Sequence, residues 1–185
     1  MKKNLLFLVL VGLVLQVAVP QTSFGQLFMT QTGKTSFFSK TPVEDISALN
    51  SNVLAAINTS NGEIAVKMNM TQFKFQNKLM EEHFNENYME SDKFPTGSFK
   101  GKINETIDYT KAGTYDVTAK GTLTIHGVTK EKVLTGKLTV GKDALTLDSN
   151  FEVALVDYKI EVPKLVWEKI AEKIAVKNNF SLVKK

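Results

Sequence analysis

The sequence predicts an all-β fold with one or two short helices, for which a closed antiparallel barrel and a sandwich are the two available architectures. Two observations support this fold class. Apolar and polar residues alternate with a period of two through most of the chain after residue 25, as in strands with one buried and one solvated face. Short polar or glycine-containing stretches separate these runs, and strands joined by short turns pair antiparallel.

The alternating runs predict about eight or nine strands, at residues 27–38, 46–49, 53–58, 63–75, 98–107, 115–126, 133–140, 145–156 and 174–183. The pattern is plain in the fourth run, where Ile64, Val66 and Met68 share one face. The three runs between residues 115 and 156 are joined by short turns and predict an antiparallel meander. Gly101 and Gly121 interrupt two runs, and an interior glycine of this kind predicts a bend or a bulge.

Two segments have helical spacing instead. In residues 77–89, "NKLMEEHFNENYM", Leu79, Met80, His83 and Phe84 recur near a helical period, which predicts a short helix. In residues 162–174, "VPKLVWEKIAEKI", a proline stands where the first turn of a helix tolerates it, and apolar residues follow at helical spacing. This segment predicts the second helix.

The first 25 residues are predicted to be a signal peptide. Lys2 and Lys3 precede an apolar run from residue 5 to 19, and a short segment with small residues follows. An apolar run of this length is shorter than the roughly 20 residues of a membrane-spanning helix, so no stable membrane anchor is expected. Residues 26–185 then form one domain, which is expected to be exported and to act in the periplasm or after secretion.

Composition excludes several classes of function. The chain has no cysteine, which rules out disulfides, thiolate catalysis and cysteine-based zinc sites. Loss of Lys2 and Lys3 lowers the basic residues from 23 to 21 against 19 acidic ones, a net charge of +2. So mild a charge gives no reason to expect a nucleic-acid partner.

Few side chains are candidates for chemistry. His83 and Glu86 lie three residues apart on the predicted helix, but a lone histidine among solvated acids is more typical of the edge of an amphipathic helix than of a metal site. His126 precedes a glycine in "GTLTIHGVTKEK", where a polar turn residue is expected. No phosphate-binding loop, nucleophile motif or paired carboxylates are found, so we expect no enzyme, no metal and no cofactor.

Phe94 and Pro95 mark a loop after the predicted helix. Proline cannot donate a hydrogen bond to a strand ladder and favours an extended residue before it. The loop therefore delivers Phe94, and then Phe99, towards the next strand. Two interpretations remain open, an aromatic plug that closes one end of a barrel and a wall or gate of an apolar cavity.

Two motifs in combination resemble the YceI-like family of exported, lipocalin-like proteins that bind polyisoprenoid chains. The first is "KFPTGSF" at residues 93–99, after the predicted helix, and the second is the hairpin "GTLTIHGVTK" at residues 121–130. The resembling core covers about residues 80–138. Outside it, the strands before Met80 look shorter than usual for the family, and Glu131 and Lys132 stand where the family often has a proline.

The resemblance implies a single lipocalin-like antiparallel barrel of about eight strands that holds a long apolar lipid, isoprenoid-like in form, in its lumen. The alternatives are a barrel with a filled lumen that acts in structure or interaction, and an enzyme acting on a bound lipid. The oligomeric state is left open, with a dimer among the options. The lumen candidates are Phe37, Ile64, Val66, Phe73, Phe75, Phe84, Phe94, Phe99, Leu123, Ile125, Leu134 and Phe151.

Overall fold

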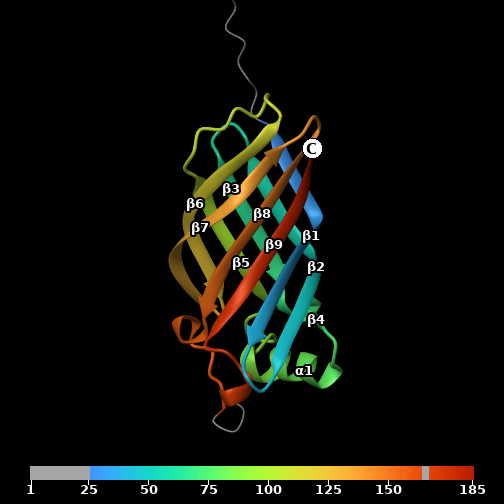
Figure 1. Ribbon diagram of the computed structural model, residues 1–185, viewed down its shortest axis with the longest axis vertical. Coiled ribbons are helices and arrows are strands. Elements are labelled where there is room, and N and C mark those ends of the chain that lie inside the picture. The colour runs from blue at the N-terminus through green and yellow to red at the C-terminus, as the bar shows by residue number, and fades with distance from the viewer. Residues whose placement is uncertain (1–25, 164–166) are drawn as a thin grey trace, which may run out of the picture.

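The chain folds into one closed antiparallel barrel with a short helix at one end (Figure 1). The computed structural model describes residues 26–163 and 167–185. The predicted signal peptide lies outside these residues. No helix in the described ranges is long and apolar enough to cross a membrane.

Eight long strands form the ring, in the order β1-β9-β8-β7-β6-β5-β3-β2, and pairing of β1 with β2 closes it. Their bounds are β1 Leu27–Lys40, β2 Asp45–Asn58, β3 Glu63–Asn69, β5 Thr96–Ile103, β6 Gly113–Ile125, β7 Val128–Val140, β8 Ala144–Ala154 and β9 Lys173–Lys184. A two-residue strand, β4 (Lys74–Phe75), pairs with β2 outside the ring. The predicted barrel and the β6-β7-β8 meander are therefore confirmed.

The strands before Met80 are not short, contrary to expectation. β1 and β2 each have 14 residues, and β2 is one strand where the sequence predicts two. The polar stretch Asn50–Asn52 resembles a turn in the sequence. In the structure it continues the strand, and Asn50 is fully buried. Its side-chain Nδ2 donates to the carbonyl oxygen of Asn69 at 3.0 Å, which satisfies the buried amide.

The predicted bulge is at another glycine. Pairing is unbroken through Gly101 and Gly121, which face each other between β5 and β6. The irregular register is in β1, on both sides of Gly33, where a Cβ atom would lie 2.7 Å from the Phe180 ring. Gly33 thus combines a bulge with the close approach of an aromatic side chain.

The first predicted helix is present, whereas the described part of the second segment contains no α-helix. Helix α1 (Lys78–His83) continues into the π-helical turn η2 (Phe84–Tyr88), and the Asn77 side chain caps α1 by accepting from the Leu79 N–H at 2.9 Å. In the second segment only a 3₁₀ turn, η4 (Trp167–Lys169), is found among the described residues, and β9 already begins at Lys173. Two further 3₁₀ turns are found among the described residues: η1 (Met70–Gln72) before β4, and η3 (Leu155–Tyr158) after β8.

One end of the barrel is packed solid. Val53, Ile57, Leu138, Leu145 and Leu182 are at most 1 % exposed and belong to one apolar cluster. Helix α1, turn η4 and the β1–β2 turn lie at the other end (Figure 1). This asymmetry leaves room for a cavity on the α1 side of the filled end.

Candidate ligand-binding cavity

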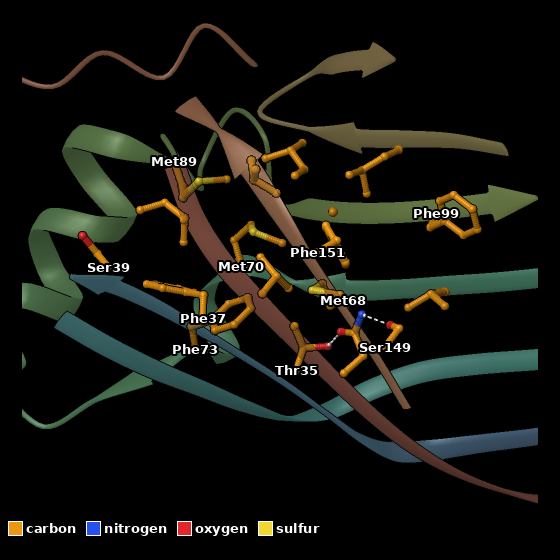
Figure 2. A pocket seen from close by; sticks show the side chains of 18 of the residues that line it. Thr35, Phe37, Ser39, Met68, Met70, Phe73, Met89, Phe99, Ser149 and Phe151 are labelled. Atoms are coloured by element: carbon orange, nitrogen blue, oxygen red, sulfur yellow. Dashed lines mark hydrogen bonds between the residues drawn. The ribbon is translucent and has the colours of Figure 1, made fainter. Parts of the chain in front are cut away.

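A cavity of about 440 Å³ lies inside the barrel (Figure 2). All eight strands of the ring contribute to its wall, together with α1 and η2. Inward positions alternate with outward ones along each strand, so the period-two pattern directs every second side chain of a strand into the lumen. The volume falls within the roughly 300–1,000 Å³ of small-molecule sites.

Eleven of the twelve lumen candidates line this cavity. They are Phe37, Ile64, Val66, Phe73, Phe75, Phe84, Phe99, Leu123, Ile125, Leu134 and Phe151. Their common feature is strand parity, except for Phe73, which follows η1, and Phe84, which lies on η2. Whether they contact a ligand stays a prediction.

Phe94 does not line the cavity, in contrast to the expectation for it. Its ring centroid lies 4.6 Å from that of His126, in an edge-on arrangement. It also fills the space above Gly127, where a Cβ atom would lie 2.5 Å from the Phe94 ring. Phe94 therefore packs on the β6–β7 turn and is neither a plug nor a gate of this cavity.

Four phenylalanines form a cluster near the α1 end of the cavity. The Phe37 ring centroid lies 5.3 Å from that of Phe73, 5.6 Å from that of Phe75 and 5.4 Å from that of Phe84. These distances are typical of favourable tilted or offset aromatic pairs. The cluster joins β1, β4 and η2, and so holds the helical segment against the barrel.

The cavity reaches the protein surface beside α1. Leu79, Glu44 and Lys169 line it there, and the Leu79 side chain is more than half exposed. Lys169 Nζ lies 3.8 Å from Glu44 Oε2, which links η4 to the β1–β2 turn across this mouth. His83 also lines the mouth. The opposite end is closed by the packed aliphatic cluster.

Three polar side chains of the wall are joined to one another by hydrogen bonds. Thr35 Oγ1 donates to Asn178 Oδ1 at 2.7 Å, and Asn178 Nδ2 donates to Ser149 Oγ at 3.0 Å (Figure 2). All three line the cavity, and Thr35 is buried. They were not among the sequence candidates, although each has the parity of its apolar neighbours on the strand. That parity is the signal that could have found them.

The two histidines occupy different places: His83 lines the cavity near its mouth, and His126 lies in the β6–β7 turn. His126 Nδ1 lies 3.0 Å from the Tyr158 carbonyl oxygen, and His126 Nε2 lies 3.1 Å from Glu90 Oε2. Hydrogen bonds from Lys93 and from His126 hold the pKa of Glu90 below its usual value. In residues 26–163 and 167–185 no group of three or more His, Asp or Glu side chains is placed to hold a metal ion.

Burial near the cavity affects one further titratable group. Tyr88, on η2, lines the cavity, and burial raises the pKa of its phenol. The neutral phenol is thus favoured, as expected for a hydroxyl group beside an apolar space.

Comparisons with known proteins agree with this geometry. A model of the YceI-like domain matches residues 20–182. A polyisoprenoid binding domain from Saccharophagus degradans, implicated in plant cell wall breakdown, superposes with a TM-score of 0.74 at 11 % identity, covering 87 % of this chain and 99 % of that one. BcnA from Burkholderia cenocepacia gives 0.68 at 12 % identity, covering 82 % and 96 %.

A third similar structure is the YCEI protein of Campylobacter jejuni. Its TM-score is 0.56 at 16 % identity, with 72 % of this chain and 80 % of that one covered. At these identities the likeness shows a shared fold. No curated protein matches the chain.

Proposed function

Since the chain belongs to the YceI-like family, we propose that it binds a long apolar lipid, isoprenoid-like in form, without a covalent bond in the lumen of its barrel. The observation that carries the proposal is the apolar cavity, closed at one end and open beside α1. The description of the Saccharophagus degradans domain as polyisoprenoid binding supports the choice of ligand class.

The energetics of such a site need few directional contacts. Each methylene that leaves water contributes about 0.8 kcal/mol, so a chain of a dozen carbons gains enough to offset the cost of ordering it. The four phenylalanines at the α1 end add large apolar surfaces to the wall.

The length of the cavity indicates how long an extended chain must be to run from one end of it to the other. From Ile174 to Phe180 the wall follows β9 over six residue steps, or about 20 Å at roughly 3.3 Å a step. With carbon–carbon bonds of about 1.5 Å, an extended chain needs at least about 13 bonds to run that distance. This range suits a lipid tail better than a compact metabolite.

The proposal is for a binding protein and not for an enzyme. His126 is engaged with Tyr158 and Glu90 outside the cavity wall, and the polar side chains in the middle of the wall, Thr35, Asn178 and Ser149, are hydrogen-bonded to one another. The space inside the barrel also favours ligand binding over a barrel with a filled lumen. We place the protein in the periplasm or outside the cell, after removal of residues 1–25.

Analysis of the purified protein by organic extraction and mass spectrometry tests the proposal. We expect an apolar lipid in near-stoichiometric amount, or uptake of added isoprenoid by the delipidated protein. If neither a co-purifying lipid nor uptake is detected with folded protein, the proposal is wrong.

A further inference from the structure

The three hydrogen-bonded polar residues of the cavity wall lie side by side on neighbouring strands. Ser149 of β8 pairs with Asn178 of β9, and Asn178 pairs with Thr35 of β1. Together they form a continuous row across three strands, which we call the polar row. Because register places them on the inward face, their position is fixed by the same pairing that builds the barrel.

The polar row lies between two apolar rows of the same wall. Two residues along each strand towards the mouth, Phe151, Val176 and Phe37 face one another. Two residues in the other direction, Leu147 pairs with Phe180. All of these residues line the cavity. A ligand that extends from the mouth to the Phe180 row must therefore pass the polar row.

The hydrogen bonds of the polar row leave donors to spare. In the order Thr35 to Asn178 to Ser149, the Ser149 hydroxyl accepts a bond, and its own proton has no acceptor among the described residues. If the Asn178 amide is turned over, the Thr35 hydroxyl proton is the one left over instead. A second amide hydrogen of Asn178 remains in either case. The row thus always offers hydrogen-bond donors.

The wall beside Ser149 is open enough for a ligand atom to reach it. Gly136 of β7 pairs with Ser149 and also lines the cavity. A Cβ atom on Gly136 would lie 3.3 Å from Ser149 Cβ and 2.5 Å from the Asp148 carbonyl oxygen. The absence of a side chain at Gly136 therefore leaves the neighbourhood of the Ser149 hydroxyl uncovered.

We propose that the polar row binds a neutral oxygen of the ligand, so that the natural ligand is a lipid carrying a hydroxyl or carbonyl group and not a plain hydrocarbon. This inference rests on the proposed function. Spare donors favour a ligand that supplies an acceptor, since a buried donor without a partner costs free energy. A carboxylate is a poor match, because the one lysine in the described wall is Lys169, at the mouth.

Binding of three probes of equal chain length tests the inference. The delipidated protein is titrated with dodecane, dodecanol and laurate, by displacement of a fluorescent apolar dye. The variants are the double variant Ser149→Ala, Asn178→Leu, which removes the amide donors and the Ser149 hydroxyl, and the triple variant Thr35→Val, Ser149→Ala, Asn178→Leu, which replaces the whole row by apolar groups. Asn179→Leu is the matched control, since Asn179 is exposed on the outer face of β9 and bonds to Asp148.

We expect the preference for dodecanol over dodecane to fall about fivefold in both row variants, which corresponds to about 1 kcal/mol for one hydrogen bond. It should be unchanged in Asn179→Leu, and laurate should bind the wild type more weakly than dodecanol. The double variant gives the answer if the triple variant does not fold.

The outcomes separate the two proposals. An unchanged preference in the row variants, or tighter binding of laurate than of dodecanol, overturns the inference and leaves lipid binding intact. Failure of the folded wild type to bind any of the three probes overturns both.

Discussion

Gly101 of β5 and Gly121 of β6 lie directly opposite each other in the barrel wall, with no room for a side chain at Gly121. A Cβ atom there would lie 2.4 Å from Gly101 Cα and 2.2 Å from the Lys100 carbonyl oxygen. Both contacts are with backbone, which cannot rotate away as a side chain does. The glycine pair therefore permits a close approach of the two strands without a break in their register.

Gly121→Ala should destabilise the fold, because one of the two backbones must shift to admit the methyl group. We expect a loss of about 2 kcal/mol, which for a domain of this size lowers the Tm by about 4–8 °C. Gly113→Ala, on the same strand, is the control, since its Cβ would meet nothing closer than 3.7 Å. Equal Tm values for the two variants in thermal unfolding would refute the argument.

Ala119→Trp should block lipid uptake. Ala119 is buried, lines the cavity and faces Ile103 and Leu134 on the neighbouring strands, so an indole ring there occupies ligand space. Overpacking should also cost about 1–3 kcal/mol of stability. Ala65→Trp is the matched control, because Ala65 is exposed on the outer side of β3. The moles of lipid bound per mole of folded protein should fall only in Ala119→Trp, and an equal effect of both would count against a luminal site.

Glu90→Gln should reduce stability at neutral pH and have no effect in acid. The pKa of Glu90 is lowered in the folded protein by hydrogen bonds from Lys93 and His126. A carboxyl group with a lowered folded pKa stabilises the fold above its unfolded pKa, about 4.3, and this contribution is lost as the pH falls through the folded value. Unfolding midpoints of wild type and variant should therefore differ at pH 7, approach each other as the pH falls below about 4.3, and converge below the lowered pKa of Glu90.

The exposed pair of Asp116 and Lys137, 2.8 Å apart, supplies a control for this experiment. Asp116→Asn should change the midpoint little at pH 7, because solvent screens so exposed a pair. A constant difference between wild type and Glu90→Gln at all pH values would mean that the glutamate acts by its shape and not by its charge.

His126→Ala should destabilise the β6–β7 turn more than His126→Asn. His126 has a φ of 51° and Gly127 a φ of 70°, a two-residue turn in which asparagine tolerates the left-handed conformation and alanine does not. Both variants lose the contacts with Tyr158 and Glu90. Denaturant unfolding should show an additional loss of about 1 kcal/mol for alanine, and equal losses would argue that backbone strain plays no part.

Strand parity accounts for most of what could be predicted from the sequence. Residues such as Ile64, Val66 and Leu123 alternate with polar neighbours, and pairing into a barrel carries every second residue to the lumen. Phe94 was misplaced because it lies in a loop, where no periodicity fixes the direction of a side chain. Its contact with His126 depends on the meeting of two segments far apart in the chain.

The polar row could not be recognised by a rule that assigns polar residues to the outside. Ser149 has the parity of Leu147 and Phe151, but only the pairing of β8, β9 and β1 shows that it has partners inside. The same limit applies to β2, for which the sequence predicts a break at Asn50. The amide of Asn50 can be buried because it is bonded to Asn69 in another strand, and that contact is not visible in the local sequence. Register between distant strands, and not local pattern, decides these positions.

The packed leucines at the far end of the barrel also determine the path by which a ligand can enter and leave the cavity. Because the cavity has one opening, a ligand that enters beside α1 must also leave there. Under the proposed function, a partner that supplies the lipid and one that receives it would use the same surface, made by Glu44, Leu79 and Lys169. The part of the ligand that enters first is the last to leave.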